Sequence, residues 1–180
     1  YTCGLRNAGG SVVENGEFFA THGRIHSIPS ENCSAICEDG KIIIKGYVRE
    51  TALFGHSLEL KRTITSEIGS SKIVIDDVVT NKTPEDEEYM IIYHMNFGFP
   101  FLSPELQMTL PENIETIPAT EHAAEYLGRE TEFTMPIDGE EETLFFHTAK
   151  DRSPDRLACV KLENPAVGIG ATVKYSVNTL

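Results

Sequence analysis

The 180-residue chain carries a formal net charge of −13, from 28 acidic and 15 basic side chains, and 40% of its residues are hydrophobic. This length favours one domain over two, so we expect a single domain over residues 1–180 with a substantial core. A surface of this sign repels phosphate backbones, which argues against a nucleic-acid partner.

The sequence shows neither a membrane-helix pattern nor a disulfide framework. No stretch approaches the ~18 apolar residues that a membrane helix needs, and no basic-then-apolar leader is visible, although a chain that begins at Tyr1 can have lost an upstream segment. Four cysteines are too few and too irregularly spaced for a disulfide framework. We therefore expect reduced thiols, a cytoplasmic protein and no membrane partner.

Strand signals dominate the chain, and helix signals are scarce. Alternating segments are bounded by turn residues, such as Asp39-Gly40 before residues 41–48 and Gly69-Ser70-Ser71 between residues 57–65 and 72–81. One short helical turn is expected around residues 120–129. This pattern predicts an antiparallel all-β sandwich or barrel. The other predicted strands are residues 89–100, 143–148, 157–162 and 170–177.

His94 lies in the apolar segment 89–100, and the strand period places it on one face with Met90, Ile92 and Asn96. Both faces of this segment are rich in apolar groups, so we expect a strand covered on both sides. An imidazole and an amide buried there without partners would cost about 1–3 kcal/mol each. Two interpretations stay open for His94, a hydrogen-bonded core histidine and a functional group.

Arg62 and His147 raise the same question. Arg62 lies on the face that Leu58, Leu60 and Ile64 form, where a guanidinium needs an anionic or acceptor partner. A structural ion pair and a substrate contact are both open for it. His147 follows two phenylalanines in a predicted strand, and a core role and a functional role are both open for it.

The segment His22-Gly23-Arg24-Ile25-His26-Ser27-Ile28-Pro29 has the composition of a ligand-binding loop. Two histidines at this spacing align as metal ligands only on a helix, and Gly23 and Pro29 argue against one. A hydrogen-bonding role is favoured over a metal site, so no metal ligand is assigned. Arg24 would suit an anionic substituent such as phosphate. His56 and His122, in polar or turn-like surroundings, are expected at the surface.

An ordered set of motifs resembles the galactose mutarotase-like (aldose 1-epimerase) superfamily, and in particular a poorly characterised branch of it. The resemblance runs over almost the whole chain. The motifs that carry it are Thr2-Cys3-Gly4-Leu5, residues 22–29, Leu53-Phe54-Gly55, Leu60-Lys61-Arg62-Thr63-Ile64, Asp77-Val78-Val79-Thr80-Asn81, Tyr93-His94-Met95-Asn96-Phe97-Gly98, residues 142–147 and Asn164-Pro165.

The resemblance implies an antiparallel β-supersandwich with a sugar-binding cleft and catalysis without a cofactor. It implies that His94 is the general acid toward the ring oxygen of the sugar and that His22 contacts the sugar. Arg24, Arg62, Asn96 and His147 are the remaining expected substrate-side residues. Such a reaction opens a cyclic hemiacetal by giving a proton to the ring oxygen and removing one from the anomeric hydroxyl.

The general base is the departure from the family pattern. The family's catalytic Glu follows a strand like residues 175–180, where this chain ends, so we expect a partial domain that lacks it. The leading hypothesis is an aldose 1-epimerase-like protein that interconverts sugar anomers. The alternative is a non-catalytic carbohydrate-binding or sensing domain. A metal-dependent sugar isomerase that uses His22, His26 and His94 or His147 is a minor alternative.

Overall fold

The computed structural model describes residues 1–153 and 155–178. The described residues form antiparallel strand pairs, one four-residue helix, α1 (Glu121–Ala124), and one short 3-10 turn, η1 (Ile25–Ser27). The predicted antiparallel all-β class is therefore confirmed. The chain divides into two compact units, Tyr1–Met95 and Asn96–Leu180. This division does not test the expected single domain, which stays a prediction.

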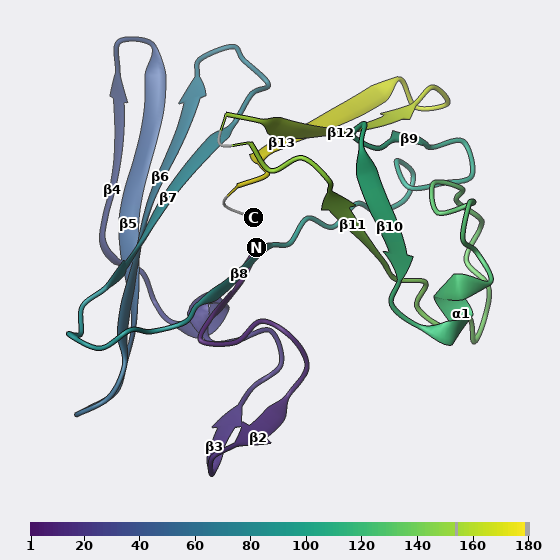
Figure 1. Cartoon of the computed structure of the whole chain (residues 1–180). Helices are drawn as coiled ribbons and strands as arrows, with labels where there is room; N and C mark the ends of the chain where they lie inside the picture. Colours follow the sequence, from purple (N-terminus) through teal and green to yellow (C-terminus); the bar gives the residue numbers. More distant parts are fainter. Residues whose placement is uncertain (154, 179–180) are drawn as a thin grey trace. The chain divides into compact units, whose positions relative to one another are not determined.

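The first unit is built on a four-stranded sheet in the order β4 (Glu31–Glu38), β5 (Lys41–Thr51), β6 (Ser57–Glu67) and β7 (Val74–Asn81) (Figure 1). Each strand pairs with its neighbour along the chain, because short turns join them. Between β4 and β5, Asp39 and Gly40 have φ values of +49° and +72°, as a two-residue type I′ hairpin turn requires. Three of these strands were predicted, and β4 was not.

Two smaller strand pairs complete the first unit. β2 (Val12–Glu14) and β3 (Glu17–Phe19) form a hairpin, and β1 (Thr2–Leu5) pairs with β8 (Met90–Tyr93). The strand expected over residues 89–100 is thus wrong in extent, because β1 supplies only four pairing residues and β8 ends at Tyr93. The expectation that both faces of this strand are buried is also wrong, since Met90 and Ile92 are about half exposed.

The core of the first unit lies between β1, η1 and one half of the four-stranded sheet. Leu5, Ile25, Leu58 and Leu60 are almost fully buried, and Val48, Val79 and Ile91 pack against them. Burying each such side chain contributes about 1.5–3 kcal/mol. Leu58 and Leu60 point the same way as the strand period predicts, so this cluster joins β1 to β6.

The second unit contains two small sheets. One has the order β13 (Ile169–Ser176), β12 (Leu157–Asn164) and β9 (Gln107–Thr109), and the other pairs β10 (Ile114–Pro118) with β11 (Phe145–Ala149). The amide of buried Asn164 donates to the Phe101 carbonyl at 2.8 Å and to Ser103 Oγ at 2.9 Å, which ties β12 to the preceding loop. Thr120 caps α1 by accepting a hydrogen bond from the Ala123 amide.

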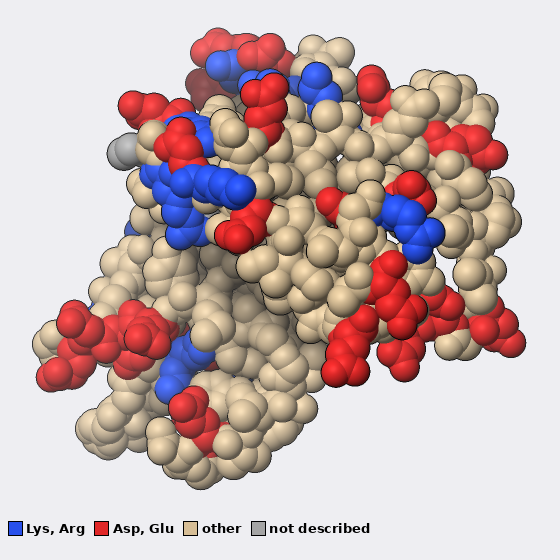
Figure 2. All heavy atoms as spheres, turned by 45° about the vertical axis from the view of Figure 1, so that its right-hand side comes forward, with Lys and Arg blue, Asp and Glu red and all other residues tan. Residues whose placement is uncertain are grey.

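The acidic runs 84–88 and 138–142 form loops rather than strands, as predicted, and most of their residues are exposed. On the face shown in Figure 2, Asp and Glu side chains form several separate groups among fewer Lys and Arg side chains. All four cysteines are free thiols. The part of the chain that the structure describes holds no helix with the length and apolar character that a bilayer crossing requires.

Two glycines allow three backbone segments to meet around β1. A Cβ on Gly4 would lie 2.0 Å from the Met90 carbonyl oxygen, and one on Gly23 would lie 2.1 Å from that of Asn7. Both residues have positive φ, +118° and +74°, which side chains other than hydrogen disfavour. The Gly4 amide also donates to the His22 carbonyl at 2.9 Å. β1 is therefore held between β8 and the loop that carries His22.

Gly23→Ala should destabilise the protein by at least about 3 kcal/mol, because the new Cβ clashes with backbone that cannot move aside. Gly40→Ala is the matched control, since Gly40 has almost the same φ and nothing within 4 Å of its Cβ position. Gly40→Ala should lower the free energy of unfolding by only about 1–2 kcal/mol, the cost of a left-handed conformation for a residue with a side chain. Urea unfolding measures both, and equal losses for the two variants would contradict the close approach.

Candidate functional site

Three imidazoles and a tyrosine ring gather at the end of the β1–β8 pair. The Tyr1 ring stacks on His94, with centroids 4.8 Å apart and planes 13° apart. His22 meets His94 edge-on at 6.2 Å, and His26 meets Tyr1 edge-on at 6.2 Å. The structure thus brings together His94 and His22, two of the predicted site residues that lie far apart in the sequence.

The backbone of His94 is held by the strand that faces it. The Tyr1 nitrogen donates to the His94 carbonyl at 2.9 Å, and the His94 amide donates to the Tyr1 carbonyl at 2.8 Å. This reciprocal pair extends the β1–β8 ladder by one step beyond Thr2 and Tyr93. His94 is therefore fixed by main-chain hydrogen bonds although it lies outside the strand.

The His94 imidazole departs from the rule that buried polar atoms are paired. Its Nδ1 atom is buried and, within the described residues, has no hydrogen-bond partner, a feature shared by the Nε2 atoms of His56 and His122. Leaving such an atom unpaired costs about 1–3 kcal/mol, and each case in a native structure needs an explanation such as a functional role or an ordered water.

The backbone of His22 is in the left-handed conformation, which residues with a side chain rarely adopt, because its φ is +66°. Left-handed backbone at a non-glycine residue costs about 1–3 kcal/mol and clusters at functional sites. The conformation is enforced by two hydrogen bonds, from the His22 amide to the Gly9 carbonyl and from the Gly4 amide to the His22 carbonyl, both 2.9 Å long. The side chain of His22 is exposed beside His94.

Arg62 forms a structural ion pair, one of the two roles that the sequence left open for it. Its Nε and an Nη atom donate to the two carboxylate oxygens of Asp77 at 2.8 and 2.6 Å. The same Nη atom donates to Thr2 Oγ1 at 2.8 Å, and the Tyr93 hydroxyl donates to Asp77 Oδ2 at 2.7 Å. Burial, helped by the bond to Asp77, raises the pKa of Tyr93, so that its hydroxyl stays a neutral donor. Arg62 as a substrate contact stays a prediction.

The Arg62 network and the His94 cluster lie on opposite faces of the β1–β8 pair. Side chains alternate along a strand, so Thr2 and Tyr93 point away from the side of Tyr1 and His94. Arg62 and His94 are therefore linked by the backbone of the β1–β8 pair and not by contact between their side chains.

Arg24 is turned toward the β2–β3 hairpin. Its guanidinium donates to the Phe18 carbonyl at 3.2 Å and lies 3.7 Å from Glu17 Oε1, while its side chain is 43% exposed. The hydrogen bonds from Arg6 hold the pKa of Glu17 below its usual range, so this carboxylate stays charged beside Arg24. An anionic ligand would have to compete with Glu17 for Arg24.

Asn96 and His147 belong to the second unit. Asn96 is exposed in the loop after β8, and His147 lies half-buried in β11. His147 Nδ1 is 2.9 Å from Thr116 Oγ1 on β10. Burial lowers the pKa of His147 and outweighs the opposing charge of Glu130. Both residues stay predictions as substrate contacts.

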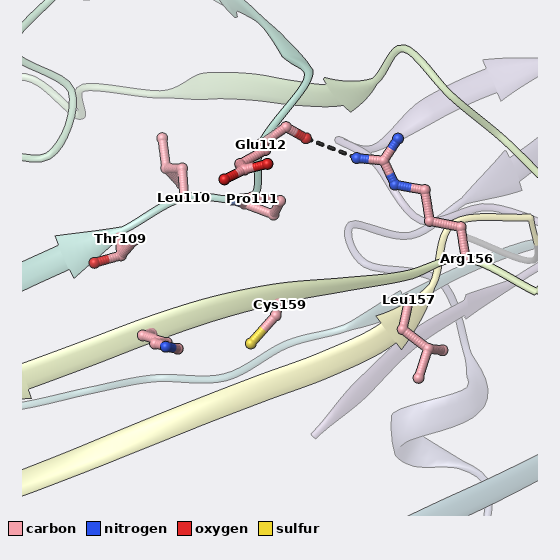
Figure 3. Close-up of a pocket in the computed structure, with 8 residues that line it drawn as sticks. Thr109, Leu110, Pro111, Glu112, Arg156, Leu157 and Cys159 are labelled. Atoms are coloured by element: carbon pink, nitrogen blue, oxygen red, sulfur yellow. Dashed lines mark hydrogen bonds between the residues drawn. The ribbon is translucent and has the colours of Figure 1, made fainter.

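A pocket in the second unit contains none of the predicted site residues. Figure 3 shows it between the loop after β9, with Leu110 and Glu112, and the start of β12, with Arg156 and Cys159. Arg156 closes one side by donating to the Glu112 carbonyl at 2.7 Å. Among the described residues, no group of three His, Cys, Asp or Glu side chains is placed to hold a metal ion.

Sequence reasoning missed several residues around His94 and Arg62. Tyr1 and Thr2 gave no local signal, because their roles come from pairing with β8. Asp77 had a signal, since the hairpin of β6 and β7 around Gly69 places it directly across from Arg62. His56 was expected at the surface but is only 7% exposed, and this expectation is wrong because His56 lies in the tight β5–β6 turn next to the core.

Asp77→Asn should lower the free energy of unfolding by about 2–3 kcal/mol, because it leaves a guanidinium without its anion. The loss is smaller than for a fully buried pair, since Arg62 keeps 27% exposure although Asp77 has only 4%. The adjacent exposed carboxylate supplies the control Asp76→Asn, expected within about 0.5 kcal/mol of wild type. Equal denaturation midpoints for the two variants would refute the role of the pair.

His147 should titrate below the usual histidine pKa of about 6.5. The unfolded chain then binds more protons than the folded one as the pH falls, so stability is complete above about pH 6.5 and declines below it. NMR titration of the His147 ring protons measures the midpoint. In His147→Gln, the loss of unfolding free energy between about pH 7 and 5 should be smaller than in wild type. A midpoint at or above about 6.5 would rule this out.

Comparison with solved structures shows the fold. The chain superposes on the crystal structure of a "putative aldose 1-epimerase" from Klebsiella pneumoniae subsp. pneumoniae MGH 78578 with a TM-score of 0.90 and 23% sequence identity. The match covers 99% of this chain and 47% of that one, so the chain spans about half the length of that protein. The predicted aldose 1-epimerase-like β-sandwich fold is thereby confirmed.

Sequence comparison gives the family. No curated protein matches the chain. A family described as "Domain of unknown function (DUF4432)" matches residues 1–180, the full extent of the chain, which therefore belongs to that family.

Proposed function

We propose that this chain contributes the histidine side of a sugar site in an aldose 1-epimerase-like isomerase, with His94 as general acid and His22 as a substrate contact. The observation that carries the proposal is the meeting of His94 and His22 at 6.2 Å, each departing from a local rule of protein structure. Such departures are expected where function outweighs stability. The fold match to a protein described as a "putative aldose 1-epimerase" supports the same reaction class.

The chemistry suits an imidazole near neutral pH. Ring opening of a cyclic hemiacetal needs a proton at the ring oxygen, and closure on the other face of the carbonyl returns it. A histidine both gives and takes a proton in this range, and a positioned acid contributes about 10²–10⁴-fold. The carboxylate that removes the anomeric proton is not assigned to a residue of this chain.

The surroundings of His94 suit a sugar. Tyr1, 59% exposed, and the exposed imidazoles of His22 and His26 offer an aromatic face and hydrogen-bonding nitrogens on one side of the strand pair. Arg24, Arg62, Asn96 and His147 are kept as proposed substrate-side residues of lower rank. Arg24 and Arg62 already have carboxylate neighbours, so His22 is the first to test.

In the full-length protein, His94→Gln should lower kcat for anomer exchange by about 10²–10⁴-fold, because the acid is replaced by a planar amide that does not titrate. His22→Gln should mainly raise KM. Exchange is followed by saturation-transfer NMR or polarimetry on a panel of free and phosphorylated sugars. The control is His122→Gln, a histidine of α1 outside the cluster, which should leave the rate unchanged. Equal rates for wild type and His94→Gln on every sugar would end the proposal.

A non-catalytic sugar-binding domain is the second candidate, favoured by the exposed ring of Tyr1 beside the imidazoles. It predicts heat of binding in calorimetry for a sugar that shows no catalysed exchange. In that case His22→Gln and His94→Gln should both weaken binding, and His122→Gln should not.

A further inference from the structure

We propose that Arg62 and Asp77 are positioning residues for His94, acting through the β1–β8 pair. This inference rests on the proposed function, because it assigns the pair to the same site. Thr2 pairs with Tyr93 in the step of the ladder directly before Tyr1 and His94.

Arg62 and Asp77 hold both members of that step. Arg62 binds Thr2 on β1, and Asp77 binds Tyr93 on β8, at 2.8 and 2.7 Å. The two charged residues are themselves joined by two hydrogen bonds between β6 and β7. The four side chains therefore clamp the small β1–β8 pair onto the large sheet at the point where His94 leaves the strand.

The clamp is rigid for physical reasons. A bidentate guanidinium–carboxylate pair fixes angle as well as distance, which a lysine could not do. Asp77 is 4% exposed, so its bonds compete weakly with water. Arg62 also lies over the Tyr93 ring, 5.8 Å from its centroid.

The clamp determines where the His94 ring stands. β1 and β8 are only four residues long, so their last step is prone to fraying without side-chain support. If that step opens, the reciprocal bonds between Tyr1 and His94 open with it, and the stacked rings separate. Misplacing a catalytic group by about 1 Å can cost about 10²-fold in rate.

The test removes one bond of the clamp and leaves the ion pair intact. In the full-length protein, Thr2→Val deletes the oxygen that accepts from Arg62, and Thr2→Ser keeps it. Thr2→Val should lower kcat about tenfold with KM within about twofold and should shift the NMR signal of the His94 ring. Thr2→Ser should restore both. A purely structural role would lower the melting temperature without moving kcat or the His94 signal.

A second pair covers the case in which Thr2→Val does not fold. Tyr93→Phe removes the bond to Asp77 from the β8 side and should shift the His94 signal, with Tyr89→Phe, a half-exposed tyrosine just before β8, as its control. An unchanged kcat and His94 signal in a folded Thr2→Val or Tyr93→Phe variant overturns the positioning role. If wild type exchanges no sugar anomers, the proposed function fails, and the His94 signal alone then decides whether the clamp positions the ring.

Discussion

The close approach of backbone on both sides of β1 is the constraint on which the arrangement of the first unit depends. Gly4 has no room for a side chain because the Met90 carbonyl lies where a Cβ would be, and Gly23 has none because of Asn7 and Gly4. These contacts place β8 on one side of β1 and the loop of His22 on the other. His22 and His94 can therefore meet at the end of β1, although neither has a local reason to be there.

Polar contacts then stabilise the backbone arrangement that Gly4 and Gly23 allow. The Arg62–Asp77 pair connects the large sheet to both strands of the β1–β8 pair, and it does so on the face away from His94. The apolar cluster of Leu5, Ile25, Leu58 and Leu60 joins the same elements. The polar contacts therefore hold the strand pair on one face, and His94 lies on the other. That division is common in binding sites, where a rigid scaffold supports exposed functional groups.

Much of the strand pattern was predictable because it is local. The Asp39-Gly40 turn predicted where β5 begins, and the alternation of residues 57–65 with the turn at Gly69-Ser70-Ser71 predicted the β6–β7 hairpin correctly. Asn15-Gly16, with φ values of +50° and +80°, is an equally strong turn signal, yet the β2–β3 hairpin was not predicted. The strand predicted over residues 89–100 was too long, because the apolar composition of this segment is that of a long strand whereas its pairing partner has four residues.

The sequence by itself determined the all-β class, three of the four strands of the large sheet and the candidate histidines, since turn chemistry and side-chain period act between near neighbours. Only the tertiary structure decided that His22 stands beside His94, that Arg62 binds Asp77, Thr2 and Tyr93, and that these two groups face opposite ways. The physical reason is that a strand's period determines which residues share a face but not which distant segment covers it. That choice depends on where the chain can pack without a clash, as at Gly4 and Gly23.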